Sequence, residues 1–159
     1  IIGKKKYIDM MKKNQLTRAL RIDKFTATAL ELVLQEYLSE EKAIQNIPVL
    51  RMIHETKEEV TARARSLKNM LNRAGLEADF GLEECESQIG GGSLPLERIP
   101  SMAVTVKPHN ISVPKLEEEM RHLEVPIIPR TANDTIYLDV RTIESRWFKQ
   151  IVQMMGELI

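Results

Sequence analysis

Hydrophobic positions recur at helical spacing through the first third of the chain. Residues 4–13 alternate lysines with apolar side chains and stop at Asn14, which predicts a short amphipathic helix. Asp23 stands where an N-cap is expected for a helix over residues 24–38. Because that helix carries a broad apolar face, we expect it to be mostly buried.

Further capping signals follow along the chain. Ser39 precedes a short helical pattern, and Pro48 stands at the start of another turn. Thr56 and Glu59 have the Thr-x-x-Glu spacing of a capping box, and apolar residues then recur at helical spacing until Gly75 ends the run. This pattern predicts a long amphipathic helix that begins a new part of the fold.

The elements become shorter after Gly75. Asn133 and Asp134 supply turn chemistry between two runs rich in β-branched residues, which predicts a hairpin. The predicted elements are an extended segment at 76–89, a strand at 101–107, a helix at 114–123, hairpin strands at 127–131 and 135–140, and a helix at 144–158.

This order of elements predicts an α+β fold. We expect residues 1–55 to form a helical connector and residues 56–159 to form a two-layer domain, in which helices cover a small antiparallel or mixed sheet. The capping box places the boundary between the two near Glu55 and Thr56.

The composition is that of an ordinary globular protein, with 43% hydrophobic and 29% charged residues. No apolar run approaches the roughly 18 residues of a membrane span, so we expect a cytoplasmic protein with no membrane partner. The single cysteine, Cys85, is interpreted as a buried or idle thiol. The three histidines have no metal-ligand spacing, so no metal site is predicted.

Charge is unevenly distributed, although the net charge is zero. Residues 1–24 carry eight basic and two acidic side chains, whereas the remainder carries fifteen basic and twenty-one acidic ones. A basic segment of this kind attracts an RNA backbone, a phosphorylated small molecule or an acidic neighbour. Aromatic residues make up only 4% of the chain and do not alternate with basic ones, so no base-stacking platform is indicated.

Arg18 and Arg21 lie three residues apart just before the helix that Asp23 caps. Two guanidinium groups at this spacing can converge on one phosphate-like anion, because each offers a planar fork of donors and a permanent charge. The alternative interpretation is a solvated helix end, which the spacing alone does not exclude.

A glycine-rich segment contains Gly90, Gly91, Gly92 and Ser93. Three consecutive glycines suit a backbone that must approach a ligand closely. The segment lacks the lysine of a phosphate-binding P-loop, so a flexible connector is the alternative interpretation.

Several segments in series resemble bacterial selenocysteine synthase, the L-seryl-tRNA selenium transferase. The matching segments are residues 3–5, 16–24, 47–51 and 87–95, and residues 135–142 are similar to the final strand of that family. The order and spacing of these segments match across nearly the whole chain.

The resemblance implies a fold-type-I pyridoxal-phosphate enzyme that converts seryl-tRNA(Sec) through an aminoacrylyl intermediate, with selenophosphate as the selenium donor. It implies a Schiff-base lysine upstream of Ile1 in a large domain that residues 1–55 continue. The chain alone is therefore expected to be inactive, with no cofactor bound covalently. Lys4, Lys5 and Lys6 resemble solvent-facing lysines of the family. The resemblance further implies homo-oligomers, either dimers or rings of dimers.

The resemblance also suggests site residues. Arg18 and Arg21 match arginines that line the family's active site and bind an anion, which we expect to be the phosphoryl group of selenophosphate. Arg130 and Arg141, with the glycine-rich residues Gly90–Ser93, are candidates for positions near the substrate. For the two later arginines a surface ion pair is the alternative.

Two other classes of function compete with the enzyme. A free-standing domain could use its basic N-terminal segment and glycine-rich loop to bind RNA or another anion. Alternatively, the apolar faces of the helices at 24–38 and 144–158 could form an oligomerisation module.

Overall fold

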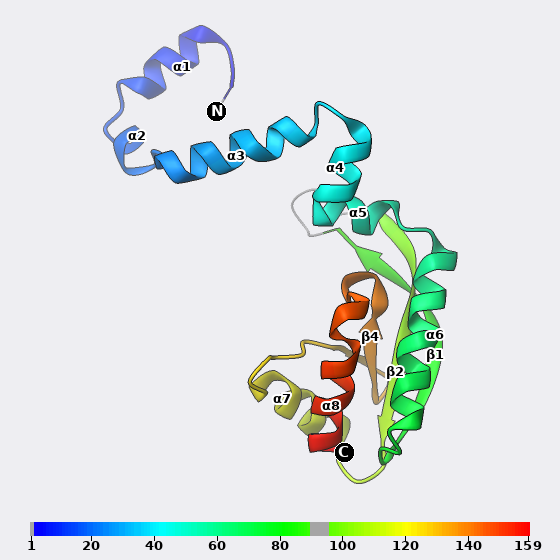
Figure 1. The fold of residues 1–159 in the computed structure, drawn as a ribbon. Coiled ribbons are helices and arrows are strands. Elements are labelled where there is room, and N and C mark those ends of the chain that lie inside the picture. Colours follow the sequence, from blue (N-terminus) through cyan, green and yellow to red (C-terminus); the bar gives the residue numbers. More distant parts are fainter. Residues whose placement is uncertain (1, 90–95) are drawn as a thin grey trace. The chain divides into compact units, whose positions relative to one another are not determined.

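The computed structural model describes residues 2–89 and 96–159, which divide into two compact units. The N-terminal unit is Ile1–Arg51, and the C-terminal unit is Met52–Ile159. Figure 1 gives the order of the elements along the chain. The functional domain boundary near Glu55 and Thr56 stays a prediction.

The N-terminal unit is helical, as its periodicity predicts. The Asp23 carboxylate accepts a hydrogen bond from the Thr26 amide at 2.9 Å, which confirms Asp23 as an N-cap. Ser39 caps the next helix by accepting from the Lys42 amide. The helices are α1 (Lys5–Lys12), α2 (Leu16–Ala19), α3 (Lys24–Glu36), α4 (Glu40–Asn46) and α5 (Pro48–His54), the last of which continues into the C-terminal unit.

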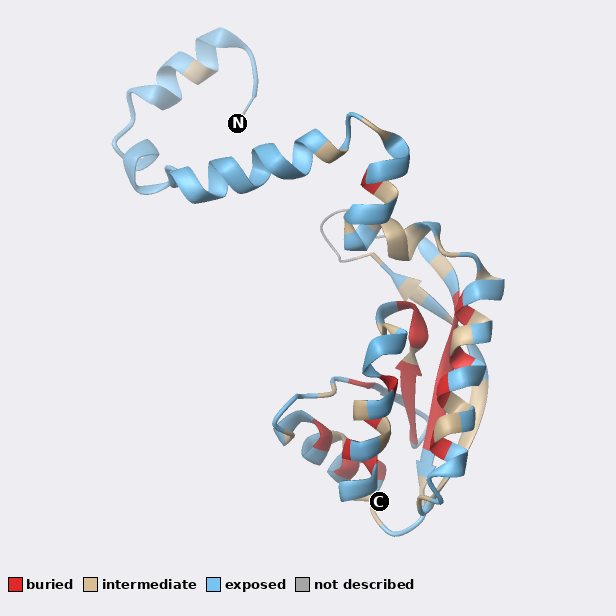
Figure 2. Cartoon of the chain, in the orientation of Figure 1, coloured by how far each residue is buried: buried red, intermediate tan, exposed pale blue. Residues whose placement is uncertain are grey.

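The expectation that the helix after Asp23 is mostly buried is wrong for this chain. No residue of α3 is buried (Figure 2). Phe25, at its start, is 89% exposed. An apolar helix face is buried only where another element covers it, and the described residues of the N-terminal unit supply no such cover. The face therefore lies open in the structure of this chain.

The C-terminal unit begins with the long helix α6 (Lys57–Arg73). The Thr56 hydroxyl accepts from the Glu59 amide, and the Glu59 carboxylate accepts from the Thr56 amide at 2.9 Å, so the predicted capping box is present. The helix ends before Gly75, whose φ of 67° is accessible at low cost only without a side chain.

The four strands form an antiparallel sheet with the order β1-β2-β4-β3. They are β1 (Ala78–Gln88), β2 (Arg98–Pro108), β3 (Arg130–Ala132) and β4 (Thr135–Asp139). The predicted hairpin turn is present, with φ of 49° at Asn133 and 53° at Asp134. The strand expected to begin at residue 127 begins at Arg130 instead, because Pro129 has no amide hydrogen to donate.

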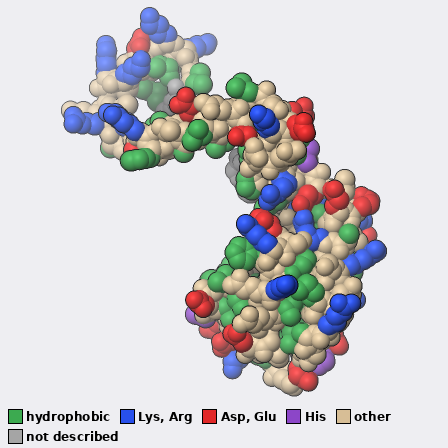
Figure 3. All heavy atoms as spheres, in the orientation of Figure 1, with side chains coloured by type: hydrophobic (Ala, Val, Ile, Leu, Met, Phe, Trp, Pro, Cys, Tyr) green, Lys and Arg blue, Asp and Glu red, His purple; other side chains and the backbone are tan. Residues whose placement is uncertain are grey.

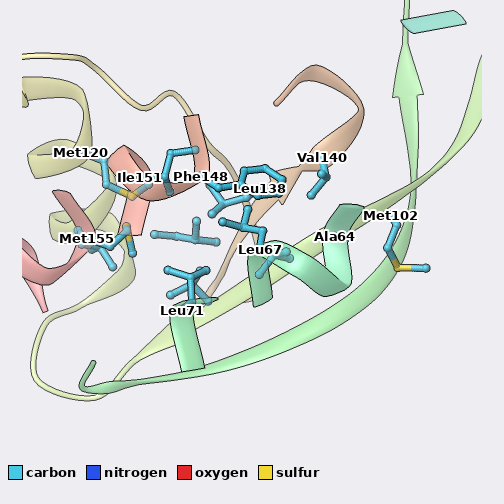
Figure 4. Packing of buried hydrophobic residues seen from close by; sticks show 14 of the residues in the cluster. Ala64, Leu67, Leu71, Met102, Met120, Leu138, Val140, Phe148, Ile151 and Met155 are labelled. Carbon is cyan, nitrogen blue, oxygen red and sulfur yellow. The ribbon is translucent and has the colours of Figure 1, made fainter. Parts of the chain in front are cut away.

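Helices α6, α7 (Val113–His122) and α8 (Phe148–Leu158) cover one face of this sheet. Short 3-10 turns, η1 (Val140–Thr142) and η2 (Ser145–Trp147), join β4 to α8, so the last helix starts later than residue 144. Figure 4 shows Leu67, Leu71 and Leu138 within the core that these elements share. The α+β class is confirmed, and of the two sheet types left open, the antiparallel one is found.

The apolar face of α8 is buried within its own unit and is not exposed to a partner. Phe148, Ile151, Met154 and Met155 are all buried within the C-terminal unit. The expectation that the helix at 144–158 exposes a surplus apolar face is therefore wrong, because the core of the same unit absorbs it.

Gly81 packs closely against the neighbouring strand. It pairs directly with Thr105, and a Cβ at this position would lie 2.4 Å from the Thr105 hydroxyl oxygen. Thr105 is buried and β-branched, so its side chain has few alternative rotamers.

We expect Gly81→Ala to lower the free energy of unfolding by about 1–3 kcal/mol, because the added methyl group overpacks this site. Urea denaturation provides the measurement. Adding Thr105→Ala should recover most of the loss. Gly156→Ala, whose Cβ would meet Leu76 at an acceptable 3.4 Å, serves as the control. Equal stability of Gly81→Ala and the parent chain would show that the strands adjust freely.

Candidate active-site elements

The face of the sheet opposite the core is polar. Side chains alternate along a strand, so Met102, Val104 and Val106 of β2 join the core while Ser101, Ala103 and Thr105 lie on the other face. The pairing register places Glu83, Cys85 and Ser87 of β1 on that face, together with Tyr137 and Asp139 of β4.

Two side-chain bridges cross this polar face from β1 to β4, over the intervening strand. The Tyr137 hydroxyl donates to the Glu83 carboxylate at 3.0 Å. The Asp139 carboxylate accepts from Ser101 at 2.7 Å and from Ser87 at 2.5 Å. Because β1 and β4 are not neighbours in the sheet, these bonds tie together strands that the backbone ladder leaves apart.

The chemistry of this face is that of neutral hydrogen-bond donors beside carboxylates. The hydrogen bond to Glu83 raises the pKa of the Tyr137 hydroxyl, since ionisation would remove its donor proton. Burial raises the pKa of the Cys85 thiol, with the charge of Asp139 adding to the effect. A thiol of raised pKa is a poor nucleophile at neutral pH.

Arg130 lies beside these bridges on the edge strand β3 and is exposed. Its guanidinium is 5.7 Å from the centroid of the Tyr137 ring and donates to the Glu86 carbonyl at 3.4 Å. No carboxylate of the described residues lies within ion-pair distance of it. The surface ion pair considered for Arg130 is therefore not formed in this part of the chain.

Arg141 occupies a different environment from Arg130. Its side chain is only 4% exposed, and its guanidinium donates to the backbone carbonyls of Met52, Glu55 and Pro100. Met52 lies in the last turn of α5, where a cation favourably meets the negative end of the helix dipole. This geometry supports a structural role rather than contact with a substrate, and it differs from a surface ion pair.

Arg63 is a half-buried arginine that the sequence does not single out. It forms a two-point ion pair with Glu55, at 2.6 and 2.7 Å, and donates to the Val140 carbonyl at 2.8 Å. Glu55 lies eight residues earlier, across a helix start, so no helical spacing marks the pair. Together, Arg63 and Arg141 fasten residues 52–55 to the turn that follows β4.

A cavity of about 510 Å³ opens beside Arg130. It lies between the end of β1, the segment that leads into β3, the end of β4 and one face of α8. Its walls are formed by Glu86–Gln88, 125–130, Tyr137–Asp139, Thr142, Ile143, Trp147, Gln150, Ile151 and Met154. Since these residues are scattered over nearly 70 positions, no local sequence motif predicts the cavity.

The candidate anion-binding residues Arg18 and Arg21 belong to the N-terminal unit. Arg18 lies in α2 and Arg21 in the segment before α3, and both side chains are exposed. The Asn14 side chain accepts from the Leu16 amide at 2.9 Å and so fixes the start of α2. Neither arginine pairs with a carboxylate among the described residues. Arg130 and Arg141 lie in the C-terminal unit, so neither unit by itself contains all four.

Several sequence candidates have other outcomes. Gly90, Gly91, Gly92 and Ser93 lie outside the described residues. No cluster of three or more metal-ligating side chains occurs within residues 2–89 and 96–159. In the same residues, no helix combines the length and the apolar character needed to cross a membrane.

Fold and candidate site thus define an α+β unit with one polar sheet face, joined along the chain to a basic helical segment. Comparison of the sequence assigns this arrangement to a family: a family profile described as L-seryl-tRNA selenium transferase matches residues 1–144. The chain belongs to that family, as its resemblance implies.

Curated relatives carry the same description. An L-seryl-tRNA(Sec) selenium transferase of Clostridium botulinum strain Hall is 48% identical over 159 residues, covering 100% of this chain and 34% of the relative. Those of Alkaliphilus oremlandii and Clostridium perfringens are 43% and 41% identical, each again with 34% of its length covered. The chain therefore spans about a third of the length of these relatives.

We expect Arg141→Ala to lower the free energy of unfolding by about 3 kcal/mol or more, because three backbone carbonyls lose the donor that Arg141 supplies. Arg141→Lys should recover little, since one ammonium group cannot reproduce a planar fork. Arg130→Ala is the matched exposed control and should change stability by no more than about 0.5 kcal/mol. If urea denaturation gives similar losses for Arg141→Ala and Arg130→Ala, the structural role assigned to Arg141 is wrong.

The Tyr137–Glu83 bridge predicts a pH effect. A raised pKa in the folded state stabilises the protein at neutral pH, and this contribution disappears as pH rises above the ordinary tyrosine value of about 10. Absorbance at 295 nm should detect ionisation of Tyr137 at a pH above the ordinary tyrosine value. Glu83→Gln should move the Tyr137 titration back toward the ordinary value, and an unchanged titration would contradict the bridge.

Proposed function

We propose that this chain is the C-terminal part of a pyridoxal-phosphate-dependent enzyme that converts seryl-tRNA(Sec) to selenocysteyl-tRNA(Sec) with selenophosphate. The observation that carries the proposal is the family match over residues 1–144, together with 48% identity to a transferase described by that activity. A reaction on tRNA of this kind belongs in the cytoplasm.

Within this enzyme, Arg18 and Arg21 bind the phosphoryl group of selenophosphate. Both guanidinium groups are exposed and carry no carboxylate partner among the described residues, so their donors are available to an incoming anion. The lysines of the same segment add positive charge around them (Figure 3). Attraction of this sort raises the local concentration of a multiply charged anion.

The described residues do not fit the cofactor site itself. A Schiff-base lysine must be desolvated enough to be neutral, and no lysine lines the cavity beside Arg130. Lys4, Lys5 and Lys6 are exposed, and Lys57 is engaged with Glu84 at 2.7 Å. We therefore assign the cofactor lysine to the part of the full-length protein outside this chain, and expect the chain alone to be inactive.

The exposed apolar face of α3 supports the proposal that this chain is one part of a larger protein. Phe25 and Leu38 are 89% and 88% exposed, and other large apolar side chains of the N-terminal unit are also open. Surfaces of this kind are normally covered by protein. We assign the cover to the rest of the full-length protein and to its partners in a homo-oligomer, either a dimer or a ring of dimers.

A binding module remains the second candidate function, because Lys4, Lys5, Lys6, Lys12 and Lys13 are all exposed. In that case the chain alone would bind tRNA with an affinity that falls steeply as salt rises. Neutralising the three adjacent lysines would weaken such binding.

The enzyme proposal predicts the effect of two substitutions in the full-length protein. We expect Arg18→Ala and Arg21→Ala each to lower kcat/KM for selenophosphate by about 10- to 150-fold, because a hydrogen bond to a charged group contributes about 1.5–3 kcal/mol. Cofactor absorbance should persist in both variants, since neither residue holds the cofactor.

Lys24→Ala provides the matched control, because it removes an exposed positive charge from the same segment. Its selenium transfer should stay within about twofold of the parent enzyme. Unchanged transfer in both arginine variants would remove the role assigned to them. A full-length protein with no selenium transfer at all would contradict the enzyme proposal itself.

A further inference from the structure

The cavity in the C-terminal unit has no role in the function proposed above. Its volume of about 510 Å³ is within the range of sites that hold small molecules, roughly 300–1,000 Å³. All of its walls come from the C-terminal unit, so its shape is defined by the packing of that unit alone.

Most of the cavity wall is apolar. The segment 125–129 forms one side, and Ile143, Ile151 and Met154 contribute to the other. Trp147 also lines the cavity and remains 44% exposed. The guanidinium of Arg146 lies 5.1 Å from the centroid of its ring. The indole surface that remains exposed beside Arg146 is available for stacking by a flat ligand.

The polar groups of the cavity differ in their availability. Asp139, Ser87 and Thr142 are engaged in hydrogen bonds with other residues of the unit. Gln150, by contrast, is half-buried on α8, and its amide forms no hydrogen bond with a described residue. Arg130 likewise has no carboxylate partner in the described part of the chain. A cation and an amide are thus left for a ligand.

These features together fit a nucleotide. A flat base can stack on the indole ring of Trp147 and against the apolar wall. The Gln150 amide can pair with two atoms of an adenine edge. The Arg130 guanidinium can bind the phosphate. An apolar carboxylic acid would leave the Gln150 amide unpaired, and a bare phosphate would leave the apolar wall unused. Of these three ligand classes, the nucleotide is the one that employs the aromatic ring, the amide and the guanidinium together.

We propose that this cavity binds an adenine nucleotide of the single-stranded 3′ end of the tRNA substrate. The identity of the RNA rests on the proposed function, whereas recognition of the nucleotide rests on the cavity. Arg130 binds the phosphate, Gln150 pairs with the base, and Trp147 stacks on it. The sequence shows no base-stacking platform because these three residues come from β3, η2 and α8.

Adenosine 5′-monophosphate is the first probe. Trp147 is the single tryptophan of the chain, so its fluorescence reports directly on this cavity. We expect a saturable change in fluorescence that inorganic phosphate does not produce. Arg130→Gln and Gln150→Leu should each weaken binding by about tenfold, while Lys149→Gln, an exposed neighbour that does not line the cavity, should leave it unchanged.

The full-length enzyme provides the second test. Arg130→Gln should raise KM for seryl-tRNA(Sec) by about tenfold, with a smaller fall in kcat, and Lys149→Gln should not. Urea denaturation of each variant separates loss of binding from loss of folding.

Failure of this proposal can be told apart from failure of the enzyme proposal. No saturable binding of the nucleotide, or an equal response to inorganic phosphate, overturns the nucleotide site even if the full-length enzyme transfers selenium. Nucleotide binding with an unchanged KM for seryl-tRNA(Sec) overturns the assignment to the RNA substrate.

Discussion

The C-terminal unit depends on the three residues that end strand β4. Asp139 accepts hydrogen bonds on the polar face of the sheet, and Val140 is fully buried in the core on the other side. Arg141 then donates to carbonyls at the end of α5 and at Pro100 of β2. Three consecutive side chains thus stabilise the polar face of the sheet, the apolar core and residues 52–55 at the start of the unit. Among the described residues, no carboxylate pairs with the buried Arg141 guanidinium, so the backbone carbonyls compensate for its desolvation.

The two faces of the sheet are closed in different ways. Helices α6, α7 and α8 exclude water from one face by apolar packing, which is the main source of stability. On the other face no described helix participates, and the Tyr137–Glu83 and Asp139–Ser87 bridges hold β1 and β4 together instead. Hydrogen bonds of this kind are directional, so they fix the position of β1 relative to β4. The ends of both strands line the cavity.

Local signals in the sequence predict local structure well. The Asp23 cap, the Thr56 capping box and the Asn133–Asp134 turn depend on residues within a few positions of one another, and all three are present. The buried role of Arg141 and the cavity could not be predicted, because their partners lie 41 to 89 residues away or on separate elements. The prediction that α3 is buried is wrong for a related reason. Amphipathic periodicity indicates that a helix has an apolar face, but it does not indicate which part of the protein packs against that face.

This difference between the two units bears on how the full-length protein is built. The C-terminal unit buries its own apolar residues, and its polar face is satisfied by its own side chains. The N-terminal unit contains the family's arginine segment but leaves Phe25, Leu32 and Leu38 more than half exposed. A helical segment without a core gains little stability from propensity alone. The proposed anion site therefore depends on protein outside this chain for its order, whereas the cavity of the C-terminal unit depends on contacts that the chain itself supplies.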